Sequence, residues 1–248
     1  MNPPPAPHGP RRALVTGASG GIGSAIARTL AAHGCHVLVH AHSRAEAARA
    51  LADAIIQSGG SAEALVLDVT DRAACQSALD GVLQAGPVQV LVHNAGMHDD
   101  AVLAGMRPEQ WQRVIDVNLN GFYNVAQPLM LPMLRTRWGR VIAISSVAGQ
   151  AGNRGQVNYA AAKSALHGAI KALALECASR GVTANAVAPG IIATEMSRSA
   201  FAADAIARMV PMQRAGQPQE VADLVAFLAS EQAGYISGQV IAINGAMY

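Results

Sequence analysis

A glycine-rich turn near the start of the chain constrains the fold more than any other feature. Residues 13–23 read Ala-Leu-Val-Thr-Gly-Ala-Ser-Gly-Gly-Ile-Gly, and residues 24–33 continue with apolar side chains at helical spacing. This order predicts a strand, a tight turn and an amphipathic helix. Gly17, Gly21 and Gly23 lack a β-carbon, so their backbone can approach a pyrophosphate at the helix N-terminus. The turn is either half of a nucleotide-binding unit or a plain connection, and other motifs must decide.

The rest of the chain continues the alternation of strands and helices. The 248 residues are 51% hydrophobic, which suits one α/β domain with a buried sheet. Short turns between alternating elements predict a doubly wound parallel sheet with right-handed crossovers. We expect Pro128 and Pro132 to kink or divide the long helical stretch. The expected strands after the first are 36–41, 64–69, 88–92, 140–146 and 239–244, and the expected later helices are 45–57, 109–137 and one starting at 217–220.

Charge and composition exclude several classes of protein. The net charge is +2 and the longest basic run is Arg11-Arg12, so neither nucleic acid nor an anionic membrane is an expected partner. No apolar run reaches the roughly 18 residues that span a bilayer, and we expect a cytoplasmic protein. Five prolines in residues 1–10 predict a disordered leader over 1–12, before a catalytic domain over 13–248. Cysteine and histidine spacings indicate no metal site.

The end of the second expected strand bears on the choice of cofactor. NAD-binding domains place an acid there, about 20 residues after the glycines, to hold the ribose 2′-hydroxyl. This chain has His42, Ser43 and Arg44 at that place, and the first acid after Gly23 is Glu46. An arginine can bind a 2′-phosphate that an acid would repel, so these residues favour NADPH.

Asp68 follows the third expected strand. Ligands of open α/β sheets collect at the carboxyl ends of strands, so Asp68 can accept a hydrogen bond from an adenine amine. Equally, it can cap the helix that begins near residue 71 or 72. The residues alone leave both interpretations open.

A serine, a tyrosine and a lysine form the expected catalytic group. Ser146 ends a strand, and Tyr159 and Lys163 are four residues apart on the next helix, so they share one helical face. An ammonium about 4 Å from the phenol would lower its pKa of about 10 by about three units at an effective dielectric of about 20. Tyr159 could then give a proton to a carbonyl oxygen while hydride reaches the carbon.

Taken in order, these motifs resemble the short-chain dehydrogenase/reductase family. They are Thr16-Gly17-x-x-x-Gly21-x-Gly23, Asn94-Ala95-Gly96, Asn118, Ser146, Tyr159-x-x-x-Lys163 and Pro189-Gly190. The resemblance implies a Rossmann-like sheet of about seven strands with helices on both faces. It makes Tyr159 the general acid, Ser146 the group that orients the substrate, Lys163 the ribose ligand that lowers the tyrosine pKa, and Asn118 the holder of a relay water. It places the cofactor against Gly17, Ser19, Gly20, Gly21, Ile22, Gly23, His42, Ser43, Arg44, Asp68, Val69, Asn94, Ala95, Gly96, Tyr159, Lys163, Pro189, Gly190, Ile192 and Thr194.

Two residues depart from the family pattern. His93 stands where an asparagine is common, and Gly20 stands where NADPH-using relatives often carry a basic residue. The second departure weakens the expectation of NADPH without reversing it.

Longer stretches are similar to the 3-oxoacyl-[acyl-carrier-protein] reductases within this family. They are residues 159–166, 178–183, 187–196 and 244–248. The resemblance implies NADPH-dependent reduction of a 3-oxoacyl thioester in fatty-acid or polyketide-type synthesis, by a homo-oligomer, with a tetramer favoured. Arg137 and Arg180 match two arginines thought to meet the carrier protein, although both can equally be ordinary helix-end residues.

Residues 194–214 are expected to form a lid over an apolar acyl chain, because their methionines adapt to varied shapes. The alternative is a loosely packed surface pair of helices. For the whole protein the alternatives are the same chemistry on a sugar, a steroid or an acyl-CoA, and a non-catalytic nucleotide-binding scaffold.

Overall fold

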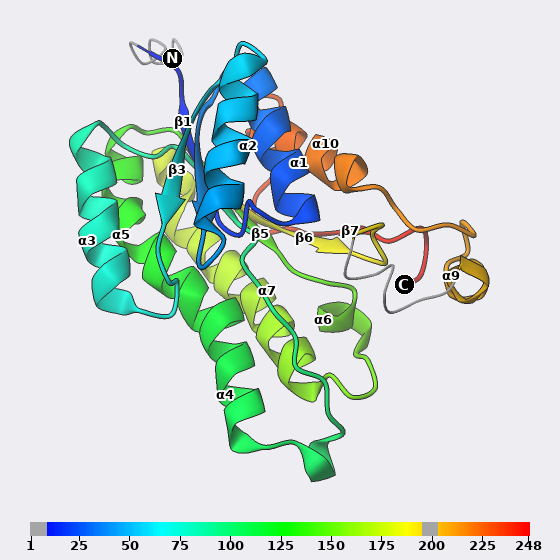
Figure 1. The fold of residues 1–248 in the computed structure, drawn as a ribbon. Coiled ribbons are helices and arrows are strands. Elements are labelled where there is room, and N and C mark those ends of the chain that lie inside the picture. The colour runs from blue at the N-terminus through cyan, green and yellow to red at the C-terminus, as the bar shows by residue number, and fades with distance from the viewer. Residues whose placement is uncertain (1–8, 195–202) are drawn as a thin grey trace.

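A parallel sheet of seven strands forms the centre of the molecule (Figure 1). The computed structural model describes residues 9–194 and 203–248. All six strand pairings are parallel. In the order β3-β2-β1-β4-β5-β6-β7, the chain adds strands on one side of β1 up to β3 and then continues on the other side from β4. The predicted doubly wound fold is confirmed. The strands are β1 Arg12–Val15, β2 His36–Ala41, β3 Ser61–Val66, β4 Val90–His93, β5 Gly139–Ile144, β6 Val182–Pro189 and β7 Val240–Ile243.

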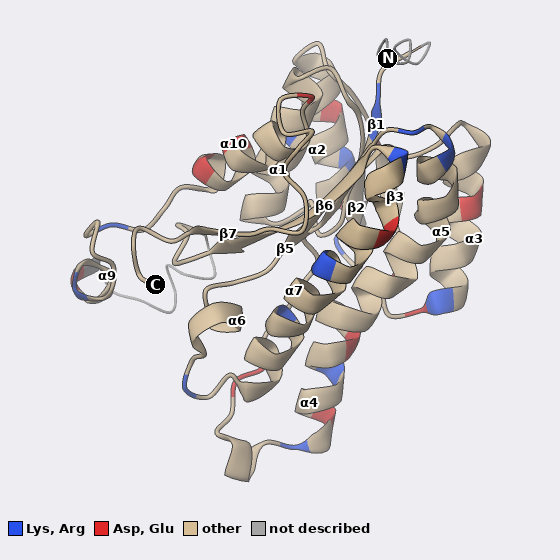
Figure 2. Cartoon of the chain, turned by 180° about the vertical axis from the view of Figure 1, so that it is seen from behind, with Lys and Arg blue, Asp and Glu red and all other residues tan. Residues whose placement is uncertain are grey.

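Helices cover both faces of this sheet (Figure 1). One apolar cluster joins the sheet to α1 (Gly21–Ala32), α2 (Ala45–Gln57) and α10 (Pro218–Leu228). A second cluster joins the other face to α3 (Arg72–Gln84), α5 (Gly121–Arg135) and α7 (Val157–Cys177). Figure 2 shows that acidic and basic residues are interspersed along the outer helices and largely absent from the sheet. The other α-helices of the described residues are α4 Pro108–Ile115, α6 Ala148–Ala151 and α9 Ala203–Met209.

The long helix expected over 109–137 divides at a different place than predicted. It breaks into α4 and α5 at a π-helical turn, Asp116–Asn120, and α5 then runs through both Pro128 and Pro132. The physical reason lies at Asn118, whose side-chain Nδ2 donates to the carbonyl of Val114, 2.8 Å away and four residues earlier. The side chain thus donates to the carbonyl that, in a regular helix, would accept the backbone N–H of Asn118 itself. The break therefore occurs at a candidate site residue.

The bounds of β1 and β3 differ slightly from the predicted ones. β3 occupies 61–66 instead of 64–69, because this edge strand tolerates polar residues such as Glu63, which lies 3.5 Å from Arg12. Arg12 itself belongs to β1, and Arg11 forms an ion pair with Glu231, so these two residues are not part of a disordered leader. Residues 1–8 lie outside the described residues. No described helix has both the length and the apolar character needed to cross a bilayer.

Candidate active site

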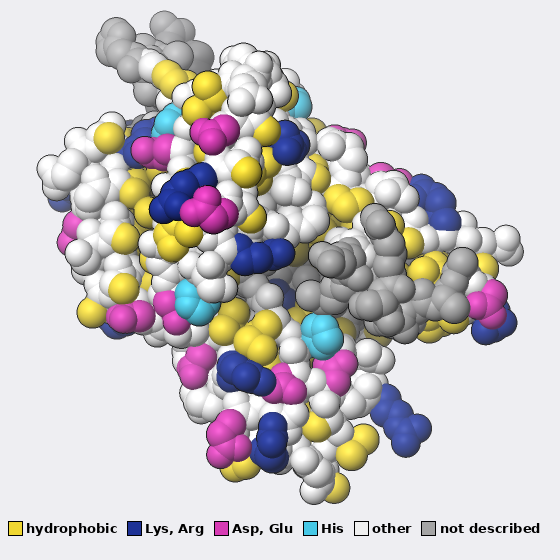
Figure 3. Space-filling view, in the orientation of Figure 1, with side chains coloured by type: hydrophobic (Ala, Val, Ile, Leu, Met, Phe, Trp, Pro, Cys, Tyr) yellow, Lys and Arg dark blue, Asp and Glu magenta, His cyan; other side chains and the backbone are white. Residues whose placement is uncertain are grey.

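The sheet brings the predicted motifs to its carboxyl edge. The glycine turn follows β1, Asn94-Ala95-Gly96 follows β4, and Ser146 follows β5. β1 and β4 are neighbours at the point where the strand order reverses, which is where open α/β sheets bind their ligands. Figure 3 shows a hollow in the centre of this face with Lys, Arg and His side chains around it.

The glycine turn leaves no room for a side chain at Gly17 or Gly23. Gly17 has a φ of +63°, and a β-carbon on Gly23 would lie 2.4 Å from the Gly17 carbonyl oxygen. Gly20 is the N-cap of α1, with no side-chain cap on the helix's first N–H groups. Free N–H groups at a helix N-terminus attract an anion, so the turn fits the pyrophosphate of a dinucleotide.

A polar brace holds this turn to β4. The Nδ2 of Asn94 donates to the carbonyls of Thr16 and Gly17, both at 3.0 Å. The Thr16 hydroxyl oxygen accepts the backbone N–H groups of Asn94 and Ala95, both at 2.9 Å. Asn94 therefore fixes the shape of the turn, which is a structural task that the sequence motif did not reveal.

The hydroxyl groups of Ser146 and Tyr159 are close enough for the serine to affect the pKa of the tyrosine. Ser146 stands two residues beyond the end of β5, and its Oγ also accepts the N–H of Ala148 at 3.1 Å, at the start of α6. Burial raises the pKa of Tyr159, the Ser146 hydrogen bond lowers it, and Asp100 raises it further, with a net increase. Tyr159 is thus held in its protonated form at neutral pH. A serine and a protonated tyrosine side by side are two donors of the kind that bind a carbonyl oxygen.

Lys163 lies next to the tyrosine, but one part of its expected role, the lowering of the tyrosine pKa, is not seen. Its Nζ donates to the carbonyl of Ile144 at 2.9 Å and lies 5.7 Å from the Tyr159 ring centroid. Burial lowers the lysine pKa to about 8, because desolvation disfavours the charged form. The expected lowering of the tyrosine pKa is absent here, since burial dominates and Lys163 is not among its causes.

Asn118 faces the same space as Lys163. A β-carbon on Gly96 would lie 2.7 Å from Asn118 Oδ1 and 3.1 Å from Lys163 Nζ. The amide is fully buried, and its Nδ2 donates to Met97 and Val114 carbonyls at 2.7 and 2.8 Å. Its Oδ1 has no hydrogen-bond partner. An orphaned acceptor beside a lysine suits the relay water that the resemblance assigns to Asn118.

The residues that would select the cofactor lie at the ends of β2 and β3. Arg44 Nη2 is 4.0 Å from the position of a Gly20 β-carbon, so its guanidinium lies beside the glycine turn. Asp68 accepts the N–H and hydroxyl of Thr70 and lies 3.5 Å from His42. Asp71, not Asp68, caps α3. The prediction that Asp68 caps this helix is therefore wrong. Ser43 is exposed at the same edge of the sheet, and the Val69 side chain packs in the core.

The segment after β6 closes the other side of the site. Pro189 ends β6, and its carbonyl accepts the N–H of Val147, next to Ser146, at 2.8 Å. A β-carbon on Gly21 would lie 3.0 Å from the Thr194 methyl group, which places this segment against the glycine turn. Ser19 and Ile22 are partly buried in the same turn, and Gly190 and Ile192 follow Pro189 along the closing segment.

The structure describes only part of the expected lid. Met196 and Phe201 lie outside the described residues. In the described part, Val210 and Met212 line a cavity of about 360 Å³ together with Ile191 and Asn244. This cavity lies at the carboxyl ends of β6 and β7, the edge that carries the catalytic groups.

Arg137 and Arg180 are far from the catalytic groups of their own chain. Arg137 lies just before β5 and donates to the Ser179 carbonyl at 3.4 Å, and Arg180 lies just before β6. Ser146 stands beyond the other end of β5. A six-residue strand is about 20 Å long, so the arginines and Ser146 occupy opposite edges of the sheet.

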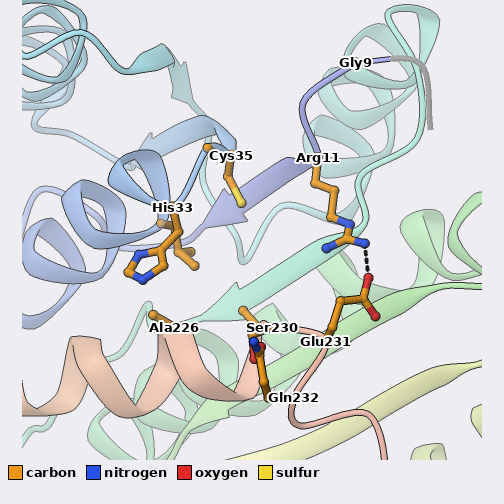
Figure 4. Close-up of a pocket in the computed structure, with 11 residues that line it drawn as sticks. Gly9, Arg11, His33, Cys35, Ala226, Ser230, Glu231 and Gln232 are labelled. Carbon is orange, nitrogen blue, oxygen red and sulfur yellow. Dashed lines mark hydrogen bonds and ion pairs between the residues drawn. The ribbon is translucent and has the colours of Figure 1, made fainter. Parts of the chain in front are cut away.

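A second cavity, of about 420 Å³, also lies at the edge away from the catalytic groups (Figure 4). Figure 4 shows Arg11 turned toward Glu231, with which it forms an ion pair, and Cys35 among the residues that line the cavity. Arg11 also stacks on Trp138, and burial raises the pKa of the Cys35 thiol. The charged and thiol groups of this cavity are thus engaged or unreactive.

Sequence reasoning missed two buried histidines beneath the site. His40 Nδ1 accepts the Gly17 N–H at 3.0 Å, and its Nε2 lies 3.1 Å from the Leu67 carbonyl. Burial lowers its pKa to about 4. His93 lies between Thr16 and Asn118, 3.3 Å from each. In the sequence, His40 stands out only because it shares even spacing on the second expected strand with His36 and His42, and His93 only because it departs from the family pattern.

Fold and site together are those of an oxidoreductase of the doubly wound nucleotide-binding class. A family model described as Enoyl-(Acyl carrier protein) reductase matches residues 17–247. The chain belongs to the short-chain dehydrogenase/reductase family, which implies a nicotinamide cofactor and oxidoreductase chemistry.

Curated relatives cover almost the whole chain. The 3-oxoacyl-[acyl-carrier-protein] reductase FabG of Aggregatibacter actinomycetemcomitans is 46% identical over 94% of this chain and 98% of its own. FabG of Escherichia coli strain K12 is 47% identical over 95% of this chain and 96% of its own. FabG of Staphylococcus aureus strain Mu50 is 43% identical over 96% of this chain and 98% of its own.

Proposed function

We propose that this protein reduces a 3-oxoacyl thioester on acyl carrier protein to the 3-hydroxyacyl form, with NADPH as the reductant. The observation that carries the proposal is the grouping of Ser146, Tyr159 and Lys163 at the carboxyl edge of the sheet, beside a glycine turn that fits a dinucleotide. Full-length similarity to FabG reductases supports the substrate class. The role suits fatty-acid synthesis.

The two hydroxyl groups act on the ketone oxygen. Ser146 and Tyr159 donate hydrogen bonds to its two lone pairs, which polarises the carbonyl. A nicotinamide cofactor held by the glycine turn would supply hydride to the carbon. Tyr159 gives its proton to the oxygen, so the product is an alcohol. Tyr159 is protonated at neutral pH, so the phenol has a proton to give in the reductive direction.

Protons for the next turnover come through Lys163 and Asn118. Lys163 is buried and next to Tyr159, and the orphaned Oδ1 of Asn118 faces the space beside it. A lysine with a pKa of about 8 gains and loses protons readily near neutral pH. It therefore suits the middle of a relay.

Arg44 is the residue that we assign to the choice of NADPH. Its guanidinium lies beside the glycine turn, and its fork of donors matches a phosphate. We expect Arg44→Asp to raise the Kd for NADPH by about tenfold or more while the Kd for NADH changes little, because each contact between charged groups contributes about 1.5–3 kcal/mol. Isothermal titration of both cofactors measures this. Arg49→Asp, on the exposed face of α2, is the matched control. Equal losses for both cofactors would show that Arg44 does not read the 2′-phosphate.

The apolar cavity near Val210 and Met212 suits the acyl chain. We propose that residues 194–214 form the substrate lid, because the described part of this segment borders a cavity at the catalytic edge. The catalytic domain then includes Arg12, the first residue of β1, and runs from there to residue 248.

An assembly follows from the exposed apolar residues of α5 and α7. Leu131 is 58% exposed and Leu175 is 84% exposed, and the two helices lie side by side on the same face of the sheet (Figures 1 and 2). Tyr123 adds to this surface two turns before Leu131. We propose that a second copy of this chain covers it in a homo-oligomer, with a tetramer favoured, in the cytoplasm.

The choice of substrate is tested by comparing thioesters. We expect NADPH oxidation with a 3-oxoacyl-carrier-protein to exceed that with an enoyl-carrier-protein and with free ketones. Hydroxyl groups aimed at one oxygen serve a ketone better than a carbon–carbon double bond. Faster turnover of the enoyl thioester would assign the site to double-bond reduction instead.

A further inference from the structure

His93 is completely buried between the nucleotide turn and the relay amide. It is the last residue of β4, and none of its surface is exposed. Its Nδ1 lies 3.3 Å from the Thr16 hydroxyl, and its Nε2 lies 3.3 Å from the backbone carbonyl of Asn118. Phe122 meets its ring edge-on, with centroids 5.5 Å apart. One side chain thus touches both parts of the site.

The surrounding hydrogen bonds determine which ring nitrogen carries the proton. The Thr16 oxygen accepts two backbone N–H groups, from Asn94 and Ala95, so its own proton must go to another acceptor. His93 Nδ1 is the acceptor within reach. Nε2 therefore carries the ring proton and donates it to the Asn118 carbonyl. The neutral ring therefore accepts a hydrogen bond from the Thr16 hydroxyl at Nδ1 and donates one from Nε2 to the Asn118 carbonyl.

A charged ring would not fit this network. Protonation would place an N–H on Nδ1, opposite a hydroxyl oxygen whose lone pairs are already used. Lys163 and His40 also face the ring, and burial, with Lys163 next, lowers the pKa of His93 to about 3. The neutral Nε2–H form is therefore the form at working pH.

The contact falls at the turn that orients Asn118. Asn118 belongs to the π-helical turn between α4 and α5, where the regular helical ladder is interrupted. Its side chain holds the turn from one side, through Val114 and Met97, and His93 holds the backbone carbonyl from the other. The position of the Asn118 Oδ1, which faces Lys163, depends on both the side-chain contacts and the His93 contact.

We propose that His93 is a positioning residue that couples the nucleotide turn at Thr16 to the relay amide of Asn118. It touches neither substrate nor cofactor. An asparagine, which relatives commonly carry at this position, is too short to reach both partners. The predicted effect of His93 on the reaction rate rests on the reductase activity proposed above. The predicted protonation and contacts of the ring do not depend on any activity.

The structural part is tested by nitrogen NMR of the histidine side chains in the cofactor-free protein. We expect the His93 ring to be neutral with its proton on Nε2, and its signals are assigned by their loss in His93→Asn. A proton on Nδ1, or a charged ring at pH 7, would overturn the proposal. This result does not depend on any substrate, so it separates the failure of this inference from a failure of the proposed function.

The kinetic part is tested by a double-mutant cycle. His93→Phe keeps the ring and removes both polar contacts, and we expect kcat to fall by about ten- to a hundredfold while the Kd for NADPH changes less. The solvent deuterium isotope effect on kcat should rise, because proton supply becomes slower. In an Asn118→Ala background the same substitution should have little further effect. Additive losses would contradict coupling through Asn118.

Two further variants control the experiment. His93→Gln restores an amide of longer reach and should recover part of kcat and lower the isotope effect, which a purely structural role would not predict. His33→Asn, an exposed histidine at the far edge of the sheet, should change nothing. If His93→Phe does not fold, His93→Asn carries the cycle, and the same coupled loss supports the proposal.

Discussion

At the scale of single residues, the site depends on burial more than on pairs of charges. Lys163 is 3% exposed, and its pKa is lowered to about 8 from 10.5 by desolvation. Tyr159 is shifted in the opposite direction, toward its protonated form, by the same cause. Burial therefore brings an acid and a lysine that exchanges protons near neutral pH into one site.

The lysine pKa predicts a pH limit. We expect kcat/KM for NADPH to fall above pH about 8, because this parameter reports groups of the free enzyme and Lys163 loses its charge there. The profile is measured from initial rates between pH 6 and 10, with carrier-bound substrate saturating. In Lys163→Arg the guanidinium stays charged, so the alkaline limb should move to higher pH. An unchanged limb would assign it to another group.

At the scale of elements, the strand–turn–helix unit could be predicted well from the sequence. β2 and α2 have the predicted bounds, 36–41 and 45–57, because apolar periodicity and flanking turn residues agree there. The π-helical turn at 116–120 could not be predicted, since it depends on a contact between the Asn118 side chain and the Val114 carbonyl. The bracing by Asn94 and the contacts of His40 and His93 also require knowledge of which strands are neighbours.

The glycine turn gives a prediction with a control in the same chain. Gly23→Ala would place a β-carbon 2.4 Å from the Gly17 oxygen, against backbone that cannot move freely. We expect it to lower the free energy of unfolding by about 1–3 kcal/mol and to weaken NADPH binding. Gly81→Ala, in the middle of α3 with open space around it, should stabilise the protein by about 0.5–1 kcal/mol. Urea unfolding measures both, and equal effects would contradict the close-packed turn.

At the scale of the whole molecule, the two edges of the sheet carry different tasks. Catalytic groups gather at the carboxyl ends of the strands, whereas Arg137 and Arg180 lie at the opposite edge. If these arginines bind the carrier protein, they serve the active site of another copy. The sequence predicted the arginines but not this separation, because only the strand direction reveals it.

A charge reversal tests this arrangement. We expect Arg180→Glu to raise KM for the carrier-bound substrate about tenfold and to leave KM for a small thioester mimic unchanged, since only the carrier protein is acidic. Leu131→Glu should dissociate the assembly, and the monomer should show the same selective rise in KM. Light scattering and initial rates check both variants. A monomer with wild-type KM for the carrier-bound substrate would show that docking does not need a second copy.

The central claim is that Tyr159 protonates a 3-oxoacyl thioester in an NADPH-dependent reduction. The most direct measurement is the rate of NADPH oxidation with a 3-oxoacyl-carrier-protein, for the wild type and for Tyr159→Phe. We predict rapid oxidation by the wild type and a loss of about 10²- to 10⁴-fold in the variant, with NADPH binding retained. Near-wild-type turnover by Tyr159→Phe, or no turnover by a folded, NADPH-binding wild type, would contradict the account.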